Sequence, residues 1–218
     1  PIPQEQPKVG GILKYSGSSD PSSFDVHTAT SSAHVTHNGV MYSGLLRIYE
    51  GQEVVTDAAE SWDISADGRT WTFVIKPGVR YHTGLEPAYA RDGTEMTAAD
   101  AKWSLEKIMG LHGQLISARS GWMKEFIDID RDDNGIELVD DRTFKIHLVQ
   151  AFPGLALLLS INFSSIVPDG ITKDDMVERP YGSGPFKLKE FQRGASWKYE
   201  RNTDYFKPGL PYLDELEH

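Results

Sequence analysis

Four oxygen-bearing side chains between residues 130 and 141 have the spacing of a calcium-binding loop. Asp130, Asp132, Asn134 and Asp141 stand at its first, third, fifth and twelfth positions, and Gly135 stands at the sixth, where such a loop turns sharply. Calcium prefers oxygen ligands of this kind. Against this hypothesis, position twelve lacks the usual bidentate glutamate, and Asp-Asn-Gly is also an ordinary hairpin turn. We favour the turn and expect neither a metal nor a cofactor.

An arginine and an indole three residues apart form a second candidate site. Arg119 can donate paired hydrogen bonds to an anion, and the Trp122 ring can stack on a ligand. The alternative is a core Trp122 beside a solvated arginine, because large aromatic side chains usually owe their place to packing. Thr30 and Ser32 could present hydroxyl and N–H groups to the same ligand, although N-capping of a helix also explains them.

Other polar clusters give weaker indications of chemistry. His27, His34 and His37 are close in sequence, but no cysteine or carboxylate stands beside them at ligand spacing, so solvated histidines are the favoured interpretation. The Gly-Ser-Gly segment at 182–184 lacks the lysine of a P-loop, and the chain contains no Gly-x-Ser-x-Gly nucleophile elbow. The sequence therefore favours a binding protein over an enzyme.

The charge balance limits the possible partners. The 218 residues include 22 basic and 32 acidic side chains, a formal net charge of −10, which disfavours binding to nucleic acid or to an anionic membrane surface. The 39% of hydrophobic residues can form one ordinary core or two small ones. The absence of cysteine excludes a disulfide framework and a thiolate zinc site.

The elements that would position the candidate residues follow from periodicity. Residues 59–75 predict a hairpin, because apolar and polar residues alternate on both sides of an Asp-Gly turn. Residues 97–110 predict a helix that begins at a Thr-x-x-Asp capping box and ends at a glycine. We also predict a strand at 10–15, a helix within 32–49, and a second hairpin over 125–148 with its turn at 131–135. The side chains expected on the buried face of the first hairpin are Trp71, Phe73 and Ile75.

Several short motifs follow one another in order along the chain. They are Ser-Trp-Asp-Ile-Ser-x-Asp-Gly-Arg-Thr-Trp-Thr-Phe at 61–73, Asp-Gly-Thr-Glu-Met-Thr-Ala-Ala-Asp-Ala-Lys-Trp at 92–103, Gly-Ser-Gly-Pro-Phe at 182–186, Glu-Arg-Asn-Thr-Asp-Tyr at 200–205 and Pro-Tyr-Leu-Asp-Glu at 211–215. This series resembles the family 5 extracellular solute-binding proteins, the peptide and nickel receptors of ABC importers. Residues 83–91 have no counterpart in the family pattern, and we expect them to form a surface insertion.

The resemblance implies an α/β fold of the two-lobed, type II periplasmic-binding class, with mixed sheets and flanking helices. Residues 1–46 would start lobe I, residues 47–178 would form an inserted smaller domain II, and residues 179–218 would return to lobe I. A third domain, which forms the opposite wall of the ligand cleft, would follow residue 218. The resemblance also implies that the segment 119–122 faces that cleft.

The function implied by the resemblance is capture of a peptide-like or other small solute, which an extracytoplasmic binding protein delivers to a membrane permease without breaking bonds. Such a protein would be periplasmic or extracellular. The polar, proline-containing residues 1–8 suit a tether to a lipid anchor. The alternative is a ligand-sensing regulatory module built on the same fold.

Overall fold

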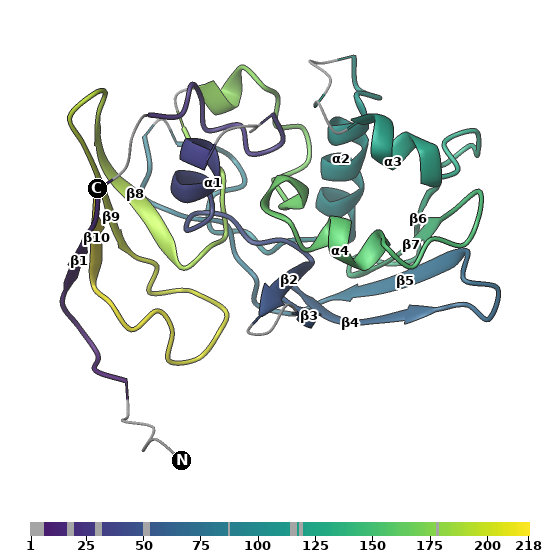
Figure 1. Ribbon diagram of the computed structural model, residues 1–218, viewed down its shortest axis with the longest axis horizontal. Coiled ribbons are helices and arrows are strands. Elements are labelled where there is room, and N and C mark those ends of the chain that lie inside the picture. The colour runs from purple at the N-terminus through teal and green to yellow at the C-terminus, as the bar shows by residue number, and fades with distance from the viewer. Residues whose placement is uncertain are drawn as a thin grey trace.

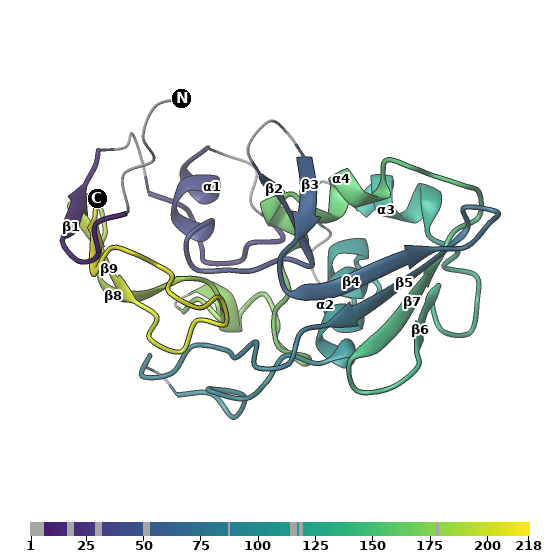
Figure 2. The same cartoon turned by 90° about the horizontal axis from the view of Figure 1, so that it is seen from below.

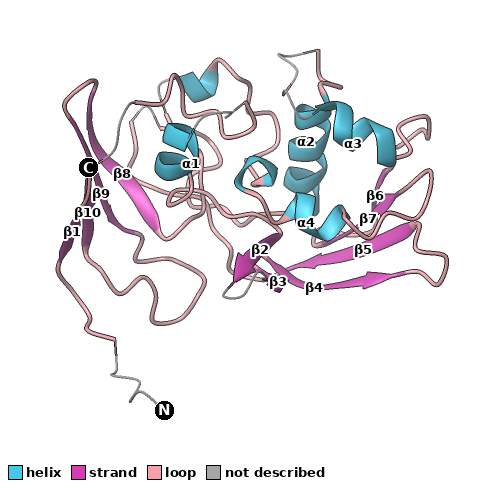
Figure 3. Ribbon diagram, in the orientation of Figure 1, coloured by secondary structure: helices cyan, strands magenta, loops and turns pink. Residues whose placement is uncertain are grey.

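The computed structural model of the chain describes residues 7–16, 20–28, 32–49, 53–86, 88–113, 117, 120–177 and 179–218, and only the backbone of 32–34. Two four-stranded sheets lie at opposite ends of the fold, with helices and a two-stranded sheet between them (Figure 1). Long loops connect these elements (Figure 3). The predicted α/β class with mixed sheets and flanking helices is confirmed.

The first sheet joins segments from both ends of the chain. Its order is β1-β10-β9-β8, with β1 parallel to β10 and the other neighbours antiparallel. The strand predicted at 10–15 is confirmed as β1, and Trp197 and Tyr199 are buried on one face of β9. The strands are β1 (Ile12–Lys14), β8 (Phe186–Gln192), β9 (Ser196–Arg201) and β10 (Glu215–Glu217).

The second sheet contains the hairpin predicted at 59–75. Gly68 adopts a φ of 72° in the turn, a conformation that a residue without Cβ reaches at no steric cost. The predicted face is confirmed, since Trp71, Phe73 and Ile75 are buried. Figure 2 shows this sheet in front of the helices, so the helices cover only one of its faces. In the order β4-β5-β7-β6, its strands are β4 (Ala59–Ile64), β5 (Thr70–Ile75), β7 (Thr143–His147) and β6 (Ile136–Leu138).

Helix α2 (Ala98–Met109) packs on this sheet and begins and ends where the sequence predicts. The Thr97 hydroxyl accepts a hydrogen bond from the Asp100 N–H, and the Asp100 carboxylate accepts one from the Thr97 N–H at 2.7 Å, which completes the capping box. Gly110 ends the helix with a φ of 74°. The fully buried apolar stripe is Ala101, Leu105, Ile108 and Met109.

The helix predicted within 32–49 is wrong beyond residue 38. The cause is a long-range contact, since the Gly184 N–H donates to the Met41 carbonyl oxygen at 2.8 Å. A Cβ on Gly182 would lie 1.9 Å from that same oxygen, so the two backbones approach too closely for any other residue. The carbonyl of Met41 is therefore not available to a helix. The observed elements are α1 (Ser32–Asn38), β2 (Leu46–Tyr49) and its antiparallel partner β3 (Glu53–Thr56).

The hairpin predicted over 125–148 is correct only in its second half, where β6 pairs with β7. Residues 120–126 instead form a helix, followed by a single bridge between Ile127 and Leu148. Met123 and Ile127 are four residues apart and both buried, which is the spacing of a helix. This helical spacing prevails over the alternation of apolar and polar residues from 126 onwards, on which the strand prediction rested. The remaining helices are α3 (Ser120–Phe126), α4 (Leu155–Leu159) and the 3-10 turns η2 (Asn162–Ser164) and η3 (Asp175–Val177).

Buried apolar side chains form two clusters. One gathers residues from 45 to 166 between the second sheet and its helices. The other gathers residues from 24 to 42 and from 167 to 216 around the first sheet. The division into lobe I and domain II, with boundaries at 46 and 178, stays a prediction.

Candidate ligand-facing site

The structure describes only part of the site predicted from the sequence. Thr30 and Arg119 lie outside the described residues, and Ser32 is the first residue of α1, with an undescribed side chain. Trp122 is on α3 and is 55% exposed. The core alternative for Trp122 is therefore wrong, and its indole is open to a ligand or a partner. Ligand contact by these four residues stays a prediction.

The segments that contain the predicted residues are joined. The Ser117 hydroxyl, between α2 and α3, donates to the His27 carbonyl oxygen at 2.7 Å, in the loop that precedes α1. The imidazole Nε2 of His27 lies 2.8 Å from the carbonyl oxygen of Ser165. Two loops that are distant in sequence thus meet at one place.

A buried ion pair fixes the same junction. Lys107, in the last turn of α2, places Nζ 2.9 Å from each carboxylate oxygen of Asp25. The two side chains are 3% and 0% exposed. The Asp25 carboxylate also accepts from the His27 N–H at 3.0 Å. Because a buried charge without its partner is costly, this pair holds the loop before α1 in one position against α2.

Burial sets the protonation of this network. Desolvation lowers the pKa of Lys107, while the Asp25 carboxylate opposes that change. Burial, with the Lys107 charge, lowers the pKa of His27 to about 4, so its imidazole is neutral at pH 7. Lys107 Nζ lies 3.3 Å from His27 Nδ1, and an ammonium group can only donate. Nδ1 is therefore the acceptor, and Nε2 carries the proton that is donated to Ser165.

Lys107 and Asp25 were not predicted from the sequence. The helical period could have predicted that Lys107 is buried, because it lies on the same face of the helix as Ser104 and next to Ile108. A lysine at such a position requires a buried acceptor. Nothing in the sequence pattern identifies that acceptor as Asp25, which lies 82 residues earlier.

The insertion predicted at 83–91 is bound to the same helix. Arg91 donates to the buried Asp100 in the first turn of α2 at 2.8 Å and forms an ion pair with Asp169. The Tyr89 ring meets the Tyr181 ring edge to face, with 5.1 Å between centroids. The segment therefore braces α2 against residues 167–181, a structural role that the sequence did not reveal.

The histidines at 27 and 37 belong to separate buried networks. His27 contacts Lys107, whereas His37 stacks on Trp197 with 4.2 Å between centroids and places Nδ1 2.5 Å from the Tyr199 hydroxyl. The side chain of His34 is not described. The interpretation as solvated histidines is wrong for His27 and His37, because both are buried.

The acidic residues of the calcium hypothesis do not converge. In the part of the chain that the structure describes, three acidic or histidine side chains have donor atoms within 4.8 Å of one another, and they are a different set. Asn134 adopts a φ of 56°, and its amide donates to Glu106 at 2.7 Å, which fits a turn. The group found consists of Asp133, Glu137 and His147 and does not include Asp130, Asp132 or Asp141.

Two hollows lie elsewhere, on the side of β2. One of about 180 Å³ has Arg47, Asp57 and Lys207 among its lining residues, and one of about 290 Å³ lies beside residues 210–213. Neither is lined by Trp122. A ligand against the exposed indole would therefore need a second wall to be enclosed.

Solved structures that resemble this chain include periplasmic binding proteins. The periplasmic binding protein DppA from Helicobacter pylori, in complex with the peptide STSA, superposes with a TM-score of 0.82 and 27% identity over 96% of this chain and 42% of its own. AgaA from A. tumefacien R10, in complex with agropinic acid, gives a TM-score of 0.82 and 27% identity over 95% of this chain and 39% of its own. These likenesses define the class as periplasmic binding proteins.

Residues 53–218 match the family described as bacterial extracellular solute-binding proteins, family 5 Middle, and the chain belongs to this family. Di/tripeptide-binding protein 1 of Pseudomonas aeruginosa strain UCBPP-PA14 is 29% identical over 76% of this chain and 32% of its own length. The dipeptide-binding protein of Escherichia coli strain K12 is 26% identical over 94% of this chain and 40% of its own. The chain thus spans less than half the length of these relatives. In the described part of the chain, no helix has the length and apolar character needed to cross a membrane.

Proposed function

We propose that this chain forms one wall of the ligand cleft in an extracytoplasmic solute-binding protein, which captures a peptide-like solute and delivers it to the permease of an ABC importer. Family membership supports this function, as do relatives named for di- and tripeptides. The proposed activity is binding without bond breaking, so the chain is not an enzyme. The protein would act in the periplasm or outside the cell, with residues 1–8 as a tether to a lipid anchor.

The observation that carries the proposal is the junction of the two loops next to an exposed indole. Ser117 and Lys107 hold the loop before α1 against the end of α2, and Trp122 stands open on the adjacent α3. A ligand surface held by buried bonds loses little conformational entropy on binding. An exposed aromatic ring suits a peptide, which offers apolar groups that can pack on it.

We place the opposite wall in sequence beyond residue 218. The chain matches between 32% and 43% of the length of its relatives, and the Trp122 face of this chain is open. In this proposal residues 1–46 and 179–218 belong to lobe I and residues 47–178 to domain II. Closure of the second wall by hinge motion would then enclose the ligand.

The test is calorimetric titration of di- and tripeptides into the full-length protein that contains this chain. We expect micromolar or tighter binding, weakened at least tenfold by Trp122→Ala. The matched control is Leu157→Ala on α4, because Leu157 is a helical apolar residue that is 50% exposed and lies outside the proposed site. Absence of peptide binding below about 100 μM in the unmodified protein would overturn the proposal.

A further inference from the structure

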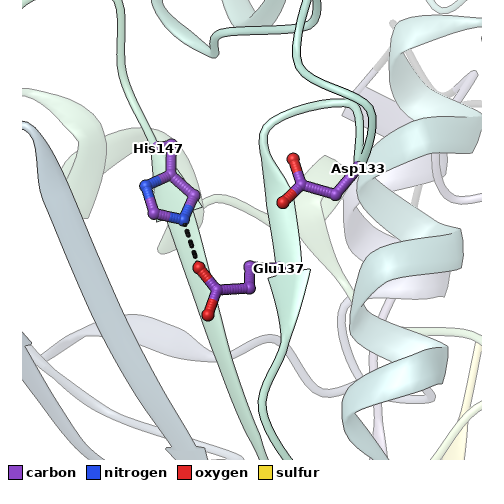
Figure 4. A group of neighbouring side chains, drawn as sticks. All are labelled: Asp133, Glu137 and His147. Carbon is purple, nitrogen blue, oxygen red and sulfur yellow. Dashed lines mark hydrogen bonds and ion pairs between the residues drawn. The ribbon is translucent and has the colours of Figure 1, made fainter.

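We propose that Asp133, Glu137 and His147 form a binding site for a divalent transition-metal ion such as Zn²⁺. Their donor atoms all lie within 4.8 Å of one another. Figure 4 shows the three side chains directed into one space, from the turn before β6, from β6 and from β7. This site is independent of the proposed peptide cleft.

The donor set decides which metal fits. Calcium takes oxygen ligands only, whereas one imidazole nitrogen with two carboxylates is typical of zinc and its neighbours in the first transition row. Bonds of about 2.0–2.2 Å to a tetrahedral ion require donors roughly 3.4 Å apart. The donor atoms now lie within 4.8 Å of one another, with His147 Nε2 and Glu137 only 2.8 Å apart, so binding would require rotations of the partly exposed Asp133 and Glu137 side chains. Water would occupy the fourth position.

Partners outside the set orient His147 and Glu137. His147 Nδ1 lies 3.4 Å from the Thr70 hydroxyl on β5, which leaves Nε2 directed at Glu137 at 2.8 Å. Lys145 holds the other oxygen of Glu137 at 3.0 Å. The ion would replace the proton now shared between Nε2 and Glu137, and the imidazole would carry its proton on Nδ1 and donate it to Thr70. Second contacts of this kind are common for metal-bound histidine and carboxylate groups.

The third ligand, Asp133, is ionised but has two competing partners, Arg131 and the Gly135 N–H, which donates to Oδ1 at 3.0 Å. Arg131 donates to both of its carboxylate oxygens, at 3.1 and 3.0 Å, and this hydrogen bonding lowers the pKa of Asp133. The ion pair is partly solvent-exposed and therefore weak. Arg131 can turn into water when a metal approaches. Arg131 and Lys145 balance the two carboxylate charges, so we expect micromolar affinity, not the nanomolar affinity of a fully anionic site.

A metal here would have a structural consequence. It would connect the turn before β6 to β7 and, through Thr70, to β5. The linked segments are parts of the second sheet, so the bound ion would stabilise the native state in proportion to its occupancy.

The test is titration of Zn²⁺ into the untagged 218-residue chain, followed by calorimetry, with the visible spectrum of Co²⁺ as a readout of the coordination. We expect a saturable site with a dissociation constant of about 1–50 μM. His147→Asn and Asp133→Asn should each weaken it at least tenfold. Asp132→Asn is the matched control, because Asp132 is in the same turn but outside the set, and it should change nothing.

A third ligand variant and a calcium control complete the experiment. Glu137→Gln removes a second ligand in case His147→Asn alters the fold, which unfolding curves without metal would show. Millimolar Ca²⁺ should leave the melting temperature unchanged. Equal Zn²⁺ affinity in the unmodified chain and in all three ligand variants, or no saturation below about 100 μM, would overturn the site. A calcium shift that is lost in Asp132→Asn would instead support the oxygen-ligand loop.

Discussion

Lys107 on α2 lies 2.9 Å from both carboxylate oxygens of Asp25, which precedes it by 82 residues, and neither side chain is open to solvent. Two buried charges in contact recover little net stability relative to an apolar pair, because each has lost its hydration. The main effect of the ion pair is to fix the position of the loop before α1. Any other placement of the loop before α1 leaves one of the two charges buried and unpaired. The position of the predicted ligand-facing segments therefore depends on this pair.

Removal of the cation should be strongly destabilising. We expect Lys107→Met to lower the free energy of unfolding by about 3–5 kcal/mol, because Asp25 is left as an uncompensated buried carboxylate. Urea denaturation measures the change. The double variant with Asp25→Asn should lose clearly less than the sum of the two single variants. Additive losses would show that the two side chains act independently.

Acidification should destabilise the protein through two buried histidines. Burial lowers the pKa of His27 and His82 from 6.5 to about 4, so the unfolded chain binds more protons than the native state between these values. The contribution of the two neutral imidazoles to the free energy of unfolding is complete above pH 6.5 and is lost as the pH falls towards 4. From pH 7.5 to 5.0 each histidine should remove about 2 kcal/mol.

The measurement for this pH effect is urea denaturation at both pH values. Glutamine can both donate and accept a hydrogen bond, so His27→Gln and His82→Gln are the suitable variants. Each should flatten the dependence of stability on pH by about half of the combined effect. An unchanged pH dependence in both variants would contradict the assignment of neutral buried imidazoles.

Trp71 should be a major contributor to the stability of the second sheet. It is buried on β5 beside Phe73, with 6.4 Å between the ring centroids. We expect Trp71→Ala to cost about 3–5 kcal/mol in chemical denaturation, through lost burial and the cavity left behind. Trp122→Ala is the control, because that indole is mostly exposed, and it should cost less than about 1 kcal/mol.

The 218-residue chain alone should bind peptides poorly. Trp122 is 55% exposed, and a ligand enclosed on one side only recovers little burial energy. Isothermal titration against a library of short peptides is the measurement, with the full-length protein as the positive control. A saturable peptide site tighter than about 10 μM on this chain would refute the proposal of a second wall.

Short-range signals in the sequence were sufficient for several elements. The hairpin around Gly68 and the helix between Thr97 and Gly110 were predicted correctly, because turn, cap and periodicity are properties of neighbouring residues. The order of the motifs also predicted the family, which the comparison over residues 53–218 confirms.

Tertiary structure decided the features that depend on contacts between distant segments. The predicted helix does not continue to residue 49, because the Met41 carbonyl oxygen accepts from the glycine-rich segment at 182–184 instead of from a helical N–H. Contacts between polar side chains also depend on tertiary structure. Asp25 meets Lys107, and Asp133 comes near His147, only when separate segments pack together. A local pattern shows which residues could be buried or charged, but partner and distance are fixed by packing of the whole chain.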